Sequence, residues 1–180
     1  MRWMFILLSL FTMGTASVYW LERPADLRQI QQDILTDYSN VTHISREDLA
    51  TQWIDDVILL DIRESDEYAV SHLEGALRID PDITSANLVS QLPKDLSGKT
   101  LIVYCSVGKR STDLASRVKD RLMADGAANV VNLEGGIFGW HNDGRPLIAQ
   151  SGPTEYVHPY DAYWKRWVKR KELTRYSPAR

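Results

Sequence analysis

Cysteine is almost absent from this sequence, which contains one among 180 residues. A single cysteine cannot form an intramolecular disulfide, and it cannot supply a CxxC zinc or redox motif. Glycine and proline are also modest in number, at ten and seven, while 44% of the residues are hydrophobic. This composition excludes collagen-like, low-complexity and wholly disordered chains. The length fits one compact domain with appendages, or at most two very small domains.

A uniform excess of positive charge is also lacking. The formal net charge is −3, yet residues 164–180 carry seven Lys or Arg against one Glu, so the rest of the chain is distinctly acidic. An acidic body argues against nucleic acid as a partner of the folded domain. His43, His141 and His158 lack metal-ligand spacing. We therefore expect neither a metal nor another cofactor.

No charged residue occurs between Trp3 and Trp20. The apolar run at 4–13 follows Arg2 and precedes small residues, a pattern typical of a secretory signal peptide cleaved after Ala16. As a helix, residues 3–20 would span about 27 Å, just enough to cross a bilayer core as a retained anchor. A buried N-terminal core helix is a third interpretation. We expect residues 1–20 to be a signal peptide or membrane anchor. The domain is then exported, periplasmic or otherwise extracytoplasmic, and either soluble after cleavage or anchored.

Short apolar bursts alternate with helical patterns in the body of the chain, after a linker or short helix at residues 21–41. The bursts, which suit strands buried on both faces of a parallel sheet, lie at 57–60, 76–79, 100–104 and 129–133. The helical patterns cover residues 45–54, 66–72, 85–92 and 110–124. This alternation predicts an α/β fold, a small doubly wound parallel sheet flanked by helices.

Residues 148–180 form an extension that is rich in aromatic and basic residues. Pro159 can open a helix, and we expect a C-terminal amphipathic helix there. The apolar stripe of that helix consists of Tyr160, Tyr163, Trp164, Trp167 and Val168. Residues 159–175 can then contact an anionic membrane surface or a partner. The alternative, which we favour for the aromatic residues, is that the stripe packs on the parent domain while the basic residues face water.

The position of Cys105 predicts that the chemistry of this chain takes place there. The predicted strand at 100–104 leads directly into Cys105, and a helix follows at once. Free amides and the helix dipole at such a place favour negative charge, and so favour a thiolate. Gly108 allows a tight loop with a positive φ, while Lys109 and Arg110 add positive charge for an anionic substrate. The ordinary alternative is a buried cysteine that serves as a small hydrophobic residue.

Three segments carry, in order, motifs of a known family. They are Leu59–Glu64 with Glu67-Tyr68 and His72–Ala76, then Cys105–Ser111, and finally Leu133–Trp140. The first resembles the Asp-x-Arg … Glu-Tyr … Gly-His-Ile-x-Gly-Ala signature of the rhodanese-like domain, with Ser71 in place of the usual glycine. The second is similar to the Cys-x-x-Gly-x-Arg-Ser active loop, and the third to the closing Gly-Gly-x-x-x-Trp motif. The resemblance covers about residues 42–147.

This resemblance implies a rhodanese-like fold and a sulfurtransferase activity. The loop cysteine of that family attacks a small anionic sulfur donor such as thiosulfate, and then passes the sulfur from a persulfide to cyanide or a thiol. Cys105 is accordingly the expected catalytic residue. The residues expected to bind the substrate and stabilise the persulfide are Ser106, Val107, Gly108, Lys109, Arg110 and Ser111.

The other motif residues have weaker claims to a catalytic role. Asp61 and Arg63 end a neighbouring strand and can support the active loop, but such a pair is more often structural. We also interpret His72 as structural and Trp140 as a core residue. Gly135 and the glycine after it are expected to form a tight turn into a final short helix.

Other functions are compatible with parts of this pattern. Phosphatases and arsenate reductases related to this fold use a Cys-x5-Arg loop, whereas Cys105 and Arg110 here are one residue closer together. A non-catalytic rhodanese module for binding or regulation is a second alternative, although such modules often lack the cysteine. The third is a membrane-tethered sulfur carrier that delivers sulfur to a protein partner.

Overall fold

The computed structural model describes residues 26–51 and 56–178. The signal peptide or anchor expected at residues 1–20 lies outside the described residues, as do residues 52–54 of the helix expected at 45–54. Within the described ranges, no helix combines the length and the apolar character needed to cross a bilayer.

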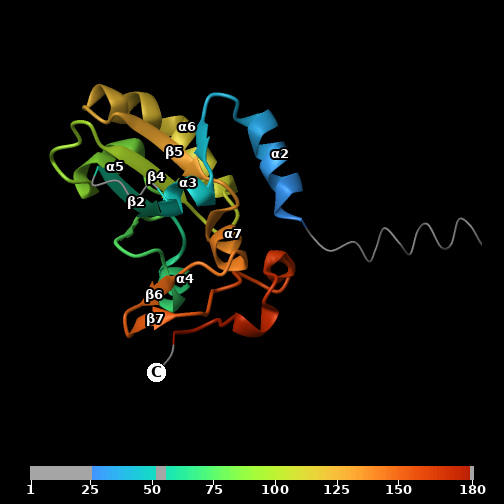
Figure 1. The fold of residues 1–180 in the computed structure, drawn as a ribbon. Coiled ribbons are helices and arrows are strands. Elements are labelled where there is room, and N and C mark those ends of the chain that lie inside the picture. The colour runs from blue at the N-terminus through green and yellow to red at the C-terminus, as the bar shows by residue number, and fades with distance from the viewer. Residues whose placement is uncertain (1–25, 52–55, 179–180) are drawn as a thin grey trace, which may run out of the picture.

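A sheet of five parallel strands forms the centre of the molecule, with the strand order β1-β5-β4-β2-β3 (Figure 1). The strands are β1 (Thr42–Ile44), β2 (Val57–Asp61), β3 (Leu77–Arg78), β4 (Thr100–Tyr104) and β5 (Asn129–Leu133). Four of them coincide with the predicted apolar bursts, although the burst at 76–79 forms only the two-residue β3. The sequence pattern does not predict β1, because the polar Thr42 and His43 leave no apolar run there.

Helices cover both faces of this sheet, which confirms the predicted doubly wound α/β fold. The described α-helices are α2 (Leu27–Asp37), α3 (Arg46–Thr51), α4 (Ser65–Val70), α5 (Ser85–Gln91), α6 (Lys109–Ala124) and α7 (Gly136–Asn142). The predicted helices at 66–72, 85–92 and 110–124 correspond to α4, α5 and α6. The helix expected at 45–54 begins as α3, and α2 occupies much of the region expected to hold a linker or short helix.

Alternate residues along the strands divide the core into two apolar clusters. On β4, Leu101 and Val103 belong to the cluster that includes the buried side chains of α5 and α6. Ile102 and Tyr104 belong to the other cluster, which contains residues of α3 and α7. This division follows from the two-residue period of a strand, and it leaves the carboxyl end of β4 buried between the two helical layers.

The C-terminal extension departs from the prediction, because no amphipathic α-helix follows Pro159 in the described residues, which end at 178. A two-stranded antiparallel hairpin comes first, consisting of β6 (Leu147–Ala149) and β7 (Gly152–Thr154). Between Pro159 and residue 178, the chain forms two short 3-10 helices, η1 (Trp164–Trp167) and η2 (Lys171–Leu173). The prediction of a continuous C-terminal amphipathic helix is therefore wrong.

Tertiary contacts explain why the helical spacing does not produce a helix. Tyr160 has a φ of +66°, which interrupts an α-helix immediately after Pro159. On either side of this turn, Val157 and Val168 are fully buried in the second cluster, and this packing sets the path of the chain. Trp164 and Trp167 pack against the same cluster, so the interpretation of the aromatic residues as packing on the parent domain is confirmed for these two.

Candidate active site

Cys105 lies at the carboxyl end of β4, and only 1% of its surface is exposed. The backbone N–H of Gly108 donates a hydrogen bond to the Cys105 Sγ at 3.2 Å. Gly108 has a φ of +100° and precedes the 16-residue helix α6, which confirms the predicted tight turn at this glycine. The sulfur therefore lies within a loop that ends at a long helix N-terminus, where a negative charge is favoured.

The N-terminus of α7 holds the carbonyl side of this loop. The backbone N–H groups of Ile137 and Phe138 donate to the carbonyl oxygens of Cys105 and Ser106, each at 2.9 Å. Gly136 lies so close to the loop that a Cβ atom there would be 2.3 Å from the carbonyl oxygen of Cys105. The expected tight turn before α7 is confirmed, and only glycine permits this approach of the two backbones.

A buried carboxylate, Glu67 on α4, connects the neighbouring motif to the active loop. Its Oε1 accepts a hydrogen bond from the Ser106 hydroxyl at 2.8 Å, and its Oε2 lies 3.2 Å from Nη2 of Arg110. Burial acts to lower the pKa of Arg110, but Cys105 and Glu67 together raise it above the ordinary value. The sequence does not connect Glu67 to the active loop, because its partners Ser106 and Arg110 lie 39 and 43 residues away along the chain.

Some of the remaining loop residues face the cavity beside Cys105, and others face the interior of the domain. Val107, Lys109 and Arg110 line a cavity beside Cys105, and Ser106 does so as well. Ser111 is fully buried, and its hydroxyl donates to Oδ1 of Asn132 at 2.6 Å, behind the loop. Neither Ser111 nor Gly108 is among the residues that line the cavity.

Asp61 and Arg63 form a fully buried ion pair with an N–O distance of 2.6 Å. The Arg63 guanidinium also donates to the carbonyl oxygen of Ser71 at 2.6 Å. Burial opposes the charged form of Arg63, yet Asp61 raises its pKa above the ordinary value. Neither residue lines the cavity at Cys105. The pair thus fixes the turn after β2, in agreement with its interpretation as structural.

Two further motif residues are also structural. The ring of His72 stacks on Tyr68, with 3.8 Å between the centroids, and the backbone of His72 pairs with Ile148. Trp140 is buried in the second cluster and donates from its indole nitrogen to the carbonyl oxygen of Pro146 at 2.8 Å.

The cavity beside Cys105 has a volume of about 200 Å³. Besides the loop residues, its lining contains two aromatic side chains from the C-terminal extension, Tyr160 and Trp164. The guanidinium carbon of Arg110 lies 5.1 Å from the centroid of the Tyr160 ring. Sequence reasoning assigns both aromatics to a helical stripe, and no local pattern indicates that they reach the nucleophile.

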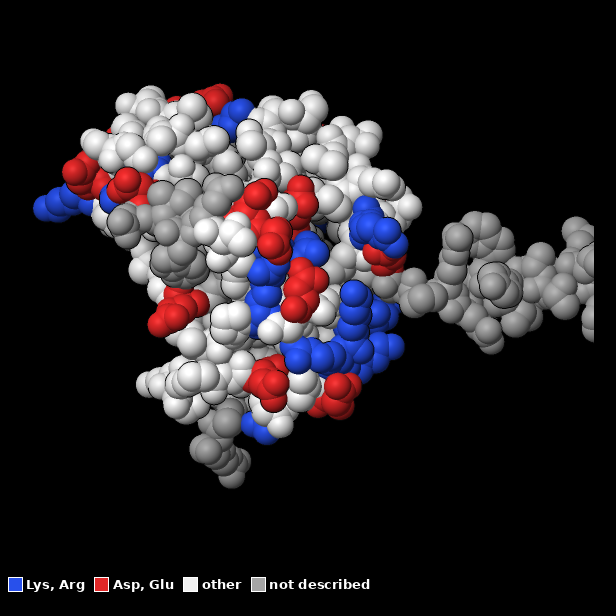
Figure 2. Space-filling view, viewed as in Figure 1, with Lys and Arg blue, Asp and Glu red and all other residues white. Residues whose placement is uncertain are grey.

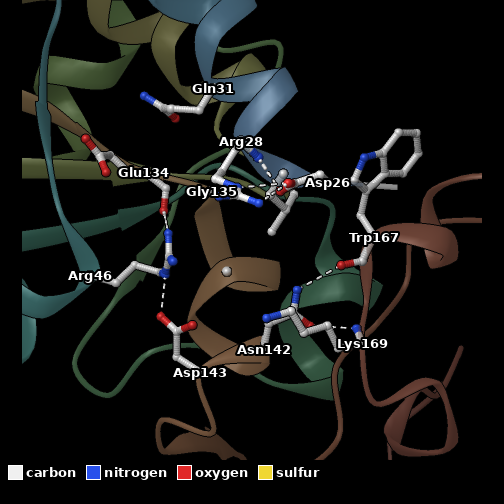
Figure 3. Close-up of a pocket in the computed structure, with 12 residues that line it drawn as sticks. Asp26, Arg28, Gln31, Arg46, Glu134, Gly135, Asn142, Asp143, Trp167 and Lys169 are labelled. Atoms are coloured by element: carbon white, nitrogen blue, oxygen red, sulfur yellow. Dashed lines mark hydrogen bonds and ion pairs between the residues drawn. The ribbon is translucent and has the colours of Figure 1, made fainter. Parts of the chain in front are cut away.

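A second hollow, of about 500 Å³, lies between the start of α2, α7 and the extension (Figure 3). Its polar groups largely satisfy one another. Arg46 bonds to Asp143 at 2.7 Å and to the carbonyl oxygen of Glu134 at 2.9 Å, while Asn142 bonds to the backbone of the extension. We interpret this hollow as the region where α2, α7 and the C-terminal extension meet. Among residues 26–51 and 56–178, no group of three or more His, Cys, Asp or Glu is arranged to hold a metal ion.

Comparisons with known proteins agree with this geometry. The family model of the rhodanese-like domain matches residues 45–143, more than half of the chain. A sulfurtransferase from Allochromatium vinosum is 33% identical over 114 residues, which are 62% of this chain and 99% of that protein. A tRNA uridine(34) hydroxylase from Yersinia enterocolitica is 33% identical over 107 residues, 57% of this chain but 29% of the hydroxylase.

A solved structure shows the same fold. The thiosulfate sulfurtransferase from Pseudomonas aeruginosa superposes with a TM-score of 0.51 at 17% identity, covering 81% of this chain and 26% of that one. The chain thus spans nearly all of one relative and less than a third of two larger proteins. With the loop, the glycine turn and the parallel sheet in place, and with the family model matching most of the described core, the chain belongs to the rhodanese-like domain family.

Proposed function

We propose that this protein is a sulfurtransferase in which Cys105 carries sulfane sulfur as a persulfide. In the first half-reaction, the thiolate attacks the outer sulfur of a donor such as thiosulfate. A bond forms between that sulfur and the Cys105 Sγ, and the donor's S–S bond breaks with its electron pair leaving on sulfite. In the second, cyanide or a thiolate attacks the outer sulfur of the persulfide, and the Cys105 thiolate departs. The two steps balance without an external oxidant or reductant.

The position of the Cys105 sulfur carries this proposal. It accepts the Gly108 N–H, lies at the N-terminus of α6 and borders a cavity large enough for an added sulfur atom. A persulfide anion at that place is stabilised by preorganised amides, which need no rearrangement during the reaction. Because Glu67 already pairs with Arg110, the exposed Lys109 is the cation more available to an anionic donor.

The similarity to the A. vinosum protein supports the same proposal, since the chain covers nearly all of a relative named a sulfurtransferase. The hydroxylases do not support an RNA substrate here, because the chain matches only about a third of their length or less.

Intact-mass measurement tests the proposal directly. Purified protein is incubated with thiosulfate under anaerobic conditions, and a gain of one sulfur atom is expected on the wild type but not on the Cys105→Ser variant. Cyanide then removes that sulfur as thiocyanate. If no sulfane donor adds sulfur while an aryl phosphate is hydrolysed, the sulfurtransferase assignment is wrong and oxyanion hydrolysis replaces it.

We also propose that the domain acts outside the cytoplasm, attached to or released from a membrane. The uncharged segment at residues 3–20 supports this location. Basic side chains gather over the C-terminal segment, on the face where the start of α2 also lies (Figure 2). Among them, Arg166 and Lys169 are exposed. A positive surface at this junction suits a nearby layer of anionic phospholipid.

A further inference from the structure

The cavity at Cys105 has two chemically different walls. One wall is the active loop, where the polar or charged side chains of Ser106, Lys109 and Arg110 lie beside Cys105 and Val107. The other is aromatic and consists of Tyr160 and Trp164 from the extension. A compact anion such as thiosulfate needs only the first wall. The aromatic wall is therefore unexplained by donor binding.

Tyr160 has a strained backbone conformation that burial of its own side chain does not offset. Its φ of +66° is the only positive value among the non-glycine residues of the described chain, and residues with a Cβ atom adopt it at a cost. The Tyr160 side chain does not recover this cost by burial, because the residue is 45% exposed. Instead, the backbone N–H of Tyr160 donates to Nδ1 of His158 at 3.0 Å, and the ring lies against Arg110. Strain of this kind is typical of residues placed for function.

Trp164 is fixed just as firmly. Its backbone N–H donates to Oδ1 of Asp161 at 2.8 Å, and its ring packs on Trp167 with 4.8 Å between the centroids. Asn142 binds the carbonyl oxygen of Trp167 at 2.8 Å. Hydrogen bonds thus hold the backbone that carries both aromatic side chains before any ligand arrives, and such preorganisation reduces the entropy lost on binding.

We propose, on the basis of the sulfurtransferase function, that this wall selects the sulfur acceptor and that the acceptor is a thiol with an aromatic or compact apolar body. A cavity of 150 Å³ in another protein binds benzene, so about 200 Å³ accommodates a benzene-sized ring together with its sulfur. The ring of the acceptor packs against Tyr160 and Trp164. Its thiolate attacks the outer sulfur of the Cys105 persulfide, a new S–S bond forms on the acceptor, and the Cys105 thiolate leaves.

Single-turnover transfer from the loaded protein tests this proposal. Protein carrying the Cys105 persulfide is mixed with cyanide, with 2-mercaptoethanol or with benzenethiol, and the loss of the persulfide is followed by intact mass. The key variant is Tyr160→Gly, because glycine keeps the positive φ while removing the ring. Tyr160→Phe restores the ring. Tyr156→Ala is the matched control, a partly exposed tyrosine of the same extension whose ring contacts Arg175 and lies outside the cavity lining.

The expected result is selective for the acceptor. For Tyr160→Gly that carries the persulfide, the ratio of the transfer rate to benzenethiol over the transfer rate to cyanide is expected to fall about tenfold relative to the wild type, the value of about one aromatic contact. Tyr160→Phe recovers the wild-type ratio. If the Tyr160→Gly variant slows equally with all three acceptors, or with none, the aromatic wall does not select the acceptor. Failure of the wild type to load sulfur contradicts the proposed function itself, and this is detected before any acceptor is added.

Discussion

Asn142 at the end of α7 binds the C-terminal extension through both atoms of its side-chain amide. Its Nδ2 donates to the carbonyl oxygen of Trp167 at 2.8 Å, and its Oδ1 accepts from the backbone N–H of Lys169 at 2.7 Å (Figure 3). The other end of α7 donates to the carbonyl oxygens of Cys105 and Ser106. One seven-residue helix thus positions both the nucleophile loop and the segment that supplies the aromatic wall.

Replacing Asn142 is expected to loosen the extension without displacing the active loop. Asn142→Ala removes two hydrogen bonds to the backbone, which together contribute about 1–3 kcal/mol to the free energy of unfolding. Chemical denaturation measures that loss. Limited proteolysis is expected to cut the variant in residues 148–178 first, while sulfur loading on Cys105 persists. Loss of loading at unchanged stability contradicts this division of roles.

The close contact between Gly136 and Cys105 predicts that adding one methyl group at residue 136 strongly reduces both stability and sulfur loading. In Gly136→Ala, the new Cβ meets the carbonyl oxygen of Cys105, so the active loop must move. We expect destabilisation by about 1–3 kcal/mol beyond the cost of the positive φ, together with strongly reduced sulfur loading.

Gly144→Ala is the control for that prediction. Gly144 also has a positive φ, +71°, but no atom lies within 4 Å of a Cβ built there. Its substitution costs about 1 kcal/mol through the backbone alone, and loading by thiosulfate remains normal. Equal losses in the two alanine variants would mean that backbone conformation, rather than the approach to Cys105, explains the glycine.

Glu67 is expected to restrain the affinity for the anionic donor. Glu67→Gln keeps a side chain that can bond to Ser106 and removes the negative charge beside Arg110. The freed positive charge then lowers the KM for thiosulfate by about threefold, an effect that added salt reduces because Arg110 is partly exposed. Steady-state kinetics at two ionic strengths measure it. If the KM for thiosulfate rises, or does not change with ionic strength, Glu67 acts only on the geometry of the loop.

Four of the five strands of the parallel sheet, the strand–loop–helix unit and the positive φ of Gly108 could be predicted, because each depends on residues close together in the sequence. Ser111 shows a first limit, since its place in the loop motif does not reveal that its hydroxyl faces Asn132. The aromatic wall shows a second. Tyr160 follows the period of a helix, but burial of Val157 and Val168 and the turn at Pro159 determine its position. Contacts between residues far apart in the sequence leave no local sequence pattern from which the position of Tyr160 could be predicted.

Acidification is expected to destabilise the protein through two buried histidines, His141 and His158, and the partly buried His43. Burial lowers the pKa of His158 below its ordinary value of 6.5, and it does the same for His43 and His141. The unfolded chain then binds protons more readily than the folded one. The stability from these neutral rings is fully present above pH 6.5 and is lost as the pH falls through 6.5 toward the folded pKa values. Unfolding between about pH 8 and pH 5.5 measures this loss.

His158 contributes a specific part of that pH dependence. Its neutral Nδ1 accepts the N–H of Tyr160, and protonation removes this acceptor. The variant His158→Asn retains an acceptor that does not titrate, so its stability is expected to change less between the two pH values. Transfer to benzenethiol at the lower pH is expected to fall less in this variant as well. An unchanged pH dependence means that His43 and His141 account for the effect.

The N-terminal segment makes the location of the protein testable. Cells expressing the full chain and a variant without residues 1–20 are separated into cytoplasmic, membrane and extracytoplasmic fractions. We expect the full chain outside the cytoplasm or in the membrane fraction, because its uncharged segment enters the export pathway, and the shortened chain in the cytoplasm. The intact mass of the exported form decides between cleavage after Ala16 and retention as an anchor. If both chains remain soluble in the cytoplasm and uncleaved, the export proposal is wrong, and sulfur transfer by Cys105 must then be sought in a reducing compartment.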